Sequence, residues 1–249
     1  MTGDPPPFTL LRPRLAAPVL LVCDHASNRV PARLGALGLP RSQLARHIGW
    51  DIGAAEVTRH LSRILRATAV LSGASRLVID CNRHPDDPTS IPEQSDGTAV
   101  PGNARLDRAE RERRARQWLF PYHDAIDAQL GRLDRLHPAV TLVSVHSFTP
   151  EMDGLARPWP VGVLWNHDPR LARSVIAALG RQGHRVGDNQ PYSGRGAAYT
   201  IDRHAAAQDR PHVTFEIRQD LIAQPAGARH WARRLAQVLR PRLGGMCRS

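Results

Sequence analysis

Three side chains with catalytic or metal-binding potential lie at the ends of, or inside, apolar runs typical of buried strands. His25 follows the run over residues 18–24, and His146 follows the run over residues 139–145. A single histidine after a strand is more often structural than a metal ligand, but two in equivalent places favour a shared metal site. Glu216 lies inside a third apolar run, where a carboxylate loses its hydration unless it is paired, protonated or beside a metal ion.

The position of Glu216 makes it a candidate general base. Desolvation would raise its pKa toward neutrality, which suits proton transfer, whereas a nearby metal ion would lower that pKa. The alternative is a structural ion pair between Glu216 and Arg218 or another arginine.

A second polar group belongs to the segment SRLVIDCNR, residues 75–83. The guanidinium groups of Arg76 and Arg83 could each bind a carboxylate through two parallel hydrogen bonds, and Asn82 could add an amide donor. The alternative is that Asp80 simply pairs with one of the two arginines.

Apolar strands and amphipathic helices alternate around these residues. Strands are expected over residues 18–24, 68–71, 77–81, 139–145, 160–165 and 212–217, and helices over residues 41–48, 54–65, 106–136, 169–179 and 226–239, with Asp168 capping the fourth. Residues 84–103 and 187–199 are rich in turn-forming residues and predict two loops, the first of a length typical of functional loops. The alternation predicts a single α/β domain over residues 1–249, with a mostly parallel mixed sheet covered by helices on both faces. Ligands of such sheets bind outside the carboxyl ends of the strands.

Composition argues against several other classes of protein. The formal charge is +11, but the arginines are spread along the chain and aromatic residues make up only 5 %, which argues against nucleic-acid binding. No run approaches the ~18 apolar residues of a membrane span, and no secretory signal is recognisable at the N-terminus. Cys23, Cys81 and Cys247 form no C-x-x-C pair, so a reducing cytoplasm is expected.

Six separated motifs, in order along the chain, resemble the N-formylglutamate amidohydrolase family over about residues 18–222. They are DHASNRVP from Asp24, HIGWDIGA from His47, SRLVIDCNR from Ser75, VHSFTP from Val145, YSGRGAAYTIDRHA from Tyr192 and EIRQDLI from Glu216. The family looks like a distant relative of the zinc carboxypeptidases, whose HSY and FELR motifs are similar to HSF and FEIR here. The resemblance therefore implies a phosphorylase/hydrolase-like α/β fold of the zinc-carboxypeptidase type.

The resemblance also implies one zinc ion as cofactor. His25 and His146 would be metal ligands, Glu216 the base, and Asn82 with Arg83 the binding site for a substrate carboxylate. Asn28 stands where the carboxypeptidase pattern H-x-x-E has its glutamate ligand. We therefore take the carboxylate ligand from Asp51, with His47, four residues earlier and on the same face of a helix, as the alternative.

The remaining expected roles concern the substrate. Arg76, Arg195, Arg203 or Arg218 would bind a second carboxylate and stabilise the oxyanion, with Arg218 counted among the catalytic residues and Ser147 among the substrate-binding ones. The expected substrate is a small anionic N-acyl amino acid, with N-formylglutamate as the leading candidate, cleaved to formate and glutamate in histidine degradation by a monomer or homodimer. Two alternatives remain: a hydrolase of another N-acyl amino acid or short peptide, and a noncatalytic binding protein that has lost its metal.

Overall fold

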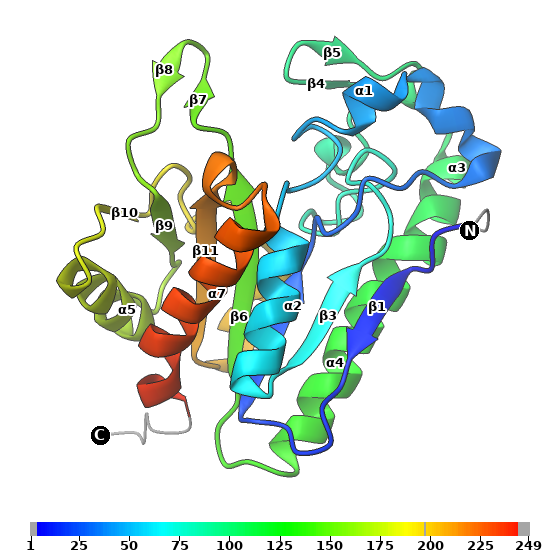
Figure 1. Ribbon diagram of the computed structural model, residues 1–249. Coiled ribbons are helices and arrows are strands. Elements are labelled where there is room, and N and C mark those ends of the chain that lie inside the picture. Colours follow the sequence, from blue (N-terminus) through cyan, green and yellow to red (C-terminus); the bar gives the residue numbers. More distant parts are fainter. Residues whose placement is uncertain (1–3, 197, 244–249) are drawn as a thin grey trace.

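Seven strands form one mixed sheet whose centre combines segments that are distant in the sequence (Figure 1). The computed structural model describes residues 4–196 and 198–243. In spatial order the strands are β1 (Phe8–Leu11), β3 (Thr68–Ser72), β2 (Val19–Cys23), β6 (Thr141–Phe148), β11 (His212–Arg218), β9 (Val161–Leu164) and β10 (Val186–Asp188). Strands β3, β2, β6 and β11 are mutually parallel, whereas β1 and β9 run antiparallel to their neighbours β3 and β11.

Helices cover both faces of the sheet, which confirms the predicted fold class. One face is packed by α2 (Ala54–Leu65), α5 (Arg170–Arg181) and α7 (Pro225–Leu239). The other is packed by α4 (Phe120–Asp134) and the short α6 (Tyr199–His204). Figure 1 shows α2 and α7 in front of the sheet and α4 behind it.

The face that α4 covers changes from apolar to polar toward the carboxyl ends of the central strands. On β6, Val143 and Val145 point into the core beneath α2 and α7, while Leu142 packs on the α4 side. Because side chains alternate along a strand, His146 must share the α4 side with Leu142. The register places Glu216 of β11 directly opposite His146. Strand alternation alone therefore brings a histidine and a carboxylate together at this edge.

Most predicted elements are present, but the strand expected over residues 77–81 is wrong. Leu77, Val78 and Ile79 are fully buried in a third apolar cluster, yet their backbone forms turns. The N–H of Val78 donates to the carbonyl of Ser75 rather than to a neighbouring strand. Burial without strand pairing explains the apolar run.

Other boundaries differ from expectation in smaller ways. The helix expected over 41–48 ends early, as α1 (Arg41–Leu44). The long helix expected over 106–136 consists of α3 (Arg108–Arg114), a π-helical turn and α4. The loop over 84–103 contains the small hairpin β4 (Gln94–Ser95) and β5 (Thr98–Ala99). Residue 197 of the other expected loop, and Cys247, lie outside the described residues.

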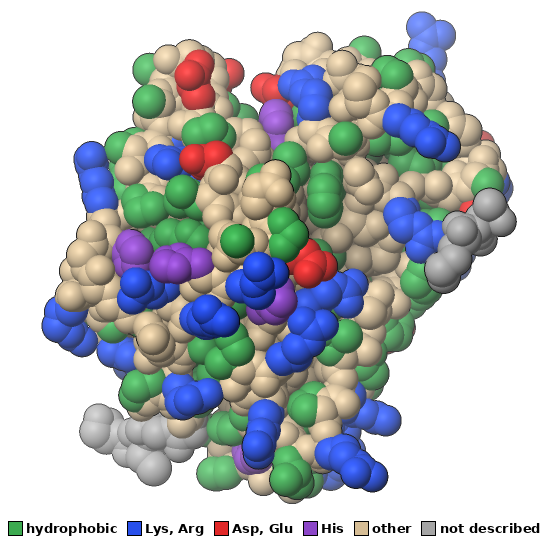
Figure 2. Space-filling view, in the orientation of Figure 1, with side chains coloured by type: hydrophobic (Ala, Val, Ile, Leu, Met, Phe, Trp, Pro, Cys, Tyr) green, Lys and Arg blue, Asp and Glu red, His purple; other side chains and the backbone are tan. Residues whose placement is uncertain are grey.

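Two hairpins rise above the carboxyl edge of the sheet on opposite sides (Figure 1). One is β4–β5, and the other is β7 (Glu151–Met152) with β8 (Leu155–Ala156). The surface is hollowed between them, and arginine side chains are spread across this face of the molecule (Figure 2). Within the described residues, no helix has the length and apolar character needed to cross a lipid bilayer.

Candidate active site

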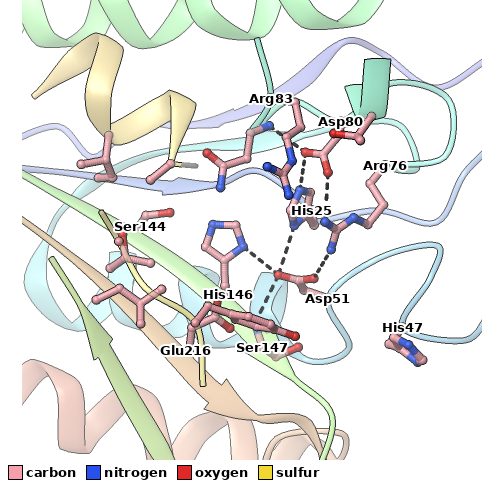
Figure 3. Close-up of a pocket in the computed structure, with 18 of the residues that line it drawn as sticks. His25, His47, Asp51, Arg76, Asp80, Arg83, Ser144, His146, Ser147 and Glu216 are labelled. Atoms are coloured by element: carbon pink, nitrogen blue, oxygen red, sulfur yellow. Dashed lines mark hydrogen bonds and ion pairs between the residues drawn. The ribbon is translucent and has the colours of Figure 1, made fainter. Parts of the chain in front are cut away.

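A cavity of about 440 Å³ opens at the carboxyl ends of the central strands. This size lies within the range of small-molecule sites. Four elements supply its central residues: His25 directly follows β2, Asp51 precedes α2, His146 lies on β6 and Glu216 lies on β11. Figure 3 shows these side chains pointing toward one another.

Two imidazoles and one carboxylate meet at the centre of the cavity. His25, Asp51 and His146, here called the central cluster, are buried, and one donor atom of each lies within 4.8 Å of the others. The Nδ1 atoms of His146 and His25 lie 2.8 and 3.4 Å from the same oxygen, Oδ2 of Asp51. The structure therefore brings together three residues that lie far apart in the sequence.

 In the chain, Asp51 follows His25 by 26 positions and His146 follows Asp51 by 95.

Two further carboxylates hold the outer nitrogens of these imidazoles. Nε2 of His25 lies 2.7 Å from Oδ1 of Asp80, and Nε2 of His146 lies 3.0 Å from Oδ2 of Asp24. The Tyr122 hydroxyl donates to the other oxygen of Asp24 at 2.8 Å and fixes that carboxylate in turn. A carboxylate on one ring nitrogen keeps the proton there and turns the other nitrogen toward the centre. The sequence offered one signal for this role, an aspartate directly before His25.

Carboxylates dominate the electrostatics of the central cluster. Burial lowers the pKa of His146, but its hydrogen bonds to the carboxylates of Asp24 and Asp51 outweigh burial and raise this pKa well above its ordinary value. Burial raises the pKa of the Asp51 carboxyl, but His25 and His146 outweigh it and hold this pKa well below the usual range. The centre of the cavity therefore stabilises positive charge, which protons or a metal cation can supply.

Among the described carboxylates in and around the central cluster, namely Asp24, Asp51, Asp80 and Glu216, only Glu216 has a buried oxygen without a hydrogen-bond partner. It is only 7 % exposed, and its Oε2 has no hydrogen-bond partner among the described residues. Burial raises the pKa of Glu216 to about 7. The alternative ion pair with Arg218 is wrong, because Nε of Arg218 instead lies 2.8 Å from Oδ1 of Asp220. Glu216 is thus poised to exchange a proton near neutral pH.

The residues of the central cluster fit a catalytic zinc ion. Two imidazoles and one carboxylate are a donor set found in catalytic zinc sites, where the remaining position is left for water or substrate. Here the cavity supplies that open side, and the carboxylates of Asp24 and Asp80 support the two imidazoles as outer partners of zinc ligands do. His47 also lines the cavity, but its Nε2 lies 3.4 Å from Asp96 and outside the cluster.

Polar residues of the expected carboxylate site line the same cavity. Arg76 pairs with Asp80 at 2.9 Å and reaches Asp51 at 3.5 Å, so the pairing of Asp80 with an arginine is present. Asn82 and Arg83 also line the cavity. Within the described part of the chain, the Arg83 guanidinium has no hydrogen bond or ion pair, and Figure 3 shows it on the same side of the cluster as Arg76.

Ser147 and three of the expected arginines have other surroundings. Ser147 lines the cavity, but its hydroxyl donates to the carbonyl of Ile52 and its N–H donates to Asp51, so it holds the Asp51 segment in place. The other three do not line the cavity: Arg195 stacks on Trp165, Arg203 pairs with Asp127, and Arg218 pairs with Asp220. Asn28 is likewise not among the lining residues.

The fold and site define an α/β protein with an acid–base cluster at the carboxyl edge of its sheet. The sequence model of the N-formylglutamate amidohydrolase family matches residues 17–223. The chain therefore belongs to this family of hydrolases that act on an amide bond, and the resemblance seen in the motifs is confirmed.

Solved structures share the fold of this chain. A gene product from Agrobacterium tumefaciens is 35 % identical, with 96 % of this chain and 95 % of that chain covered and a TM-score of 0.91. An N-formylglutamate amidohydrolase from Ralstonia eutropha JMP134 is 23 % identical, with 94 % and 96 % covered and a TM-score of 0.72, and it shares the fold. No curated protein matches the chain.

Proposed function

We propose that this chain is a zinc-dependent amidohydrolase of small N-acyl amino acids, with N-formyl-L-glutamate as the reference substrate of its family. The observation that supports this most directly is the convergence of His25, Asp51 and His146 beside the unpartnered carboxylate of Glu216. The products would be a carboxylic acid, formate in the reference reaction, and the free amino acid.

In this proposal, His25, Asp51 and His146 hold the zinc ion. When bound there, zinc lowers the pKa of a water molecule and polarises the carbonyl of the scissile amide. Glu216 accepts a proton from the attacking water and donates it to the nitrogen of the departing amine. Its pKa of about 7 in the surrounding protein suits both transfers.

The substrate carboxylate binds at Asn82 and Arg83. Arg83 contributes a guanidinium with no ion pair to a described residue, and its planar fork can bind a carboxylate through two hydrogen bonds. Arg76 is already held by Asp80 and Asp51, so we assign it to the stabilisation of negative charge that develops on the reacting carbonyl oxygen. Arg195, Arg203 and Arg218 take no part in this proposal because they do not line the cavity.

Asn28 does not weigh against catalysis in this arrangement. The alternative of a noncatalytic binding protein depended on the missing glutamate at that position, but Asp51 offers a carboxylate to both imidazoles. The donor set therefore does not need a ligand from position 28.

The test is product release from N-formyl-L-glutamate by purified protein. We expect formate release that a chelator abolishes and added zinc restores, with about one zinc ion per chain in metal analysis. Full activity of protein that has been stripped of metal would contradict the proposed zinc dependence. Absence of turnover on every N-acyl amino acid, with zinc bound, would contradict the proposed hydrolysis.

A further inference from the structure

The cavity has two ends of different chemistry, with the central cluster between them. One end contains Arg76, Arg83 and Asp80, and His47 lies further out on that side (Figure 3). The other end lies on the far side of His146, where Figure 3 shows Ser144. A substrate that crosses the cavity therefore contacts charged groups at one end and uncharged side chains at the other.

The floor of the second end is a row of side chains on three neighbouring strands. Ser144 lies two residues before His146 on β6, and Thr214 lies two residues before Glu216 on β11. The register places Thr214 opposite both Ser144 and Leu164 of β9. Because strands rise roughly 3.3 Å per residue, this row lies about 7 Å from the level of His146 and Glu216.

The walls of this end are also uncharged. Ala198 and Ile201 line it from the α6 side, and Trp165 follows β9. We call the six residues the uncharged end: Ser144, Leu164, Trp165, Ala198, Ile201 and Thr214. Two carboxylates contact residues of this end from outside the cavity: Asp24 accepts from the hydroxyl of Ser144, and Asp188 accepts from the indole N–H of Trp165. Neither carboxylate lines the cavity.

The order of groups in the substrate assigns each end its occupant. In every N-acyl amino acid the carboxylate, the scissile amide and the acyl chain follow one another along the molecule. A carboxylate on Arg83 and an amide beside Glu216 direct the acyl chain toward the uncharged end. A formyl group has only a hydrogen atom at that point and would leave the uncharged end without an apolar occupant.

We propose that the chain prefers uncharged acyl groups longer than formyl, aliphatic or aromatic, and that the uncharged end binds them. This inference rests on the proposed function, because it takes Glu216 and the central cluster as the place of hydrolysis. Residues of the uncharged end are then specificity-determining residues for the acyl group.

Two isomeric substrates test the inference with the zinc-loaded full-length chain. N-butyrylglycine and N-formyl-L-norvaline have the same atoms, but their apolar carbons lie on opposite sides of the amide. The kcat/KM of each compound is divided by the rate of its own hydrolysis in alkali, which corrects for the intrinsic reactivity of its amide. N-formylglycine, which has no apolar chain on either side of the amide, is the reference compound. Apolar burial favours binding by about fourfold per methylene group, so we expect kcat/KM for N-butyrylglycine to exceed both formyl compounds by more than about tenfold.

The outcomes separate the inference from the proposed function. A higher kcat/KM for N-formyl-L-norvaline would place the amino-acid side chain in the uncharged end and overturn the inference. Highest activity on N-formylglycine or N-formyl-L-glutamate would also overturn it, while leaving amide hydrolysis intact. Turnover of none of these compounds would overturn the proposed function instead.

A variant tests where the acyl chain binds. Ala198 lines the cavity immediately before α6 and is half-buried against the apolar core on the α4 side, so Ala198→Phe should narrow the uncharged end. In Ala198→Phe we expect the ratio of kcat/KM for N-butyrylglycine to that for N-formylglycine to fall at least tenfold. In the control variant Ala198→Ser, whose side chain is close in size to the natural alanine, the ratio should stay near wild type. An unchanged ratio in a folded, zinc-loaded Ala198→Phe protein would overturn the inference. If that variant does not fold, the isomer comparison on the natural chain decides the matter.

Discussion

Two groups of buried histidines lie on the α4 side of the sheet, and their hydrogen-bond partners differ. In the central cluster, the inner nitrogens of both imidazoles face Asp51 and the cavity. In the second group, His123 of α4 and His204 of α6 bond to each other at 2.8 Å. The outer nitrogens of this pair bind the carbonyl of Cys81 and the carboxylate of Asp127. Neither His123 nor His204 lines the cavity.

The pKa values of the two histidine groups also shift in opposite directions. Burial lowers the pKa of His123 to about 4, and burial likewise lowers the pKa of His204. In the central cluster, burial lowers the pKa of His146 too, but the carboxylates of Asp24 and Asp51 outweigh it. Burial alone therefore does not distinguish a metal site from a structural histidine pair. The number of buried carboxylates around the imidazoles, and their access to a cavity, makes the distinction.

The two histidine groups should differ most strongly in their contribution to metal binding. His146→Ala should lose the bound zinc and all measurable turnover, because it removes one of three ligands. The matched variant His123→Ala should keep one zinc ion per chain and lose stability on the order of 1–3 kcal/mol through its unpaired partners. Metal analysis and urea unfolding check both. Zinc loss in His123→Ala would remove the distinction between the groups.

Glu216, which lies beside the central cluster, should act in catalysis without binding the metal. Glu216→Ala is expected to lower kcat by about a thousandfold, the size of a general acid–base contribution, while the zinc content stays near wild type. Steady-state kinetics with metal analysis on the same sample provides the measurement. Activity close to wild type in this variant would remove Glu216 from the proposed mechanism.

A carboxylate that holds the outer nitrogen of an imidazole should influence zinc affinity in the central cluster but not in the pair of His123 and His204. In Asp24→Asn, an amide N–H facing Nε2 of His146 would move the imidazole proton onto Nδ1, the nitrogen that faces the centre. We expect zinc affinity to fall 10- to 100-fold, as competition with a chelator would measure. Asp127→Asn, at the equivalent place beside His204, should leave zinc affinity unchanged. Equal effects of the two substitutions would contradict the assigned role of Asp24.

The smallest effect concerns stability and pH in the metal-free protein. Glu216 has a pKa of about 7 in the folded chain against 4.5 ordinarily, so the folded state binds more protons between these values. The carboxyl therefore lowers stability as pH rises from about 4.5 to about 7. Glu216→Gln should gain on the order of 2 kcal/mol at pH 8 relative to pH 4, measured by urea unfolding. An equal gain at both pH values would contradict the raised pKa, and bound zinc should reduce the gain.

The fold was largely predictable because burial and periodicity act locally. The strands and helices around His25, His146 and Glu216 follow from apolar runs and their alternation. The edge strands β1 and β10 were not predicted, since short edge strands carry little apolar signal. The segment 77–81 misled because a buried turn and a buried strand share the same composition.

The site was predictable where a polar residue interrupts an apolar strand. Glu216 stood out for this reason, and the two histidines stood out because each directly follows an apolar run, although β6 continues past His146 to Phe148. The roles of Asp24 and Asp80 depend on contacts across 122 and 55 positions, which no local pattern contains. The same limit applies to Arg195, Arg203 and Arg218, whose partners only the tertiary structure reveals.

One feature of the sheet bears on how the enzyme would lose its geometry when heated. His146 and Glu216 are ladder partners on β6 and β11, and strands flank this pair on both sides. Their spacing is therefore held by main-chain hydrogen bonds in the interior of the sheet, where exchange of amide hydrogens requires opening of the whole structure. Fraying of the two surface hairpins would leave that spacing intact, so irreversible heat inactivation should coincide with global unfolding.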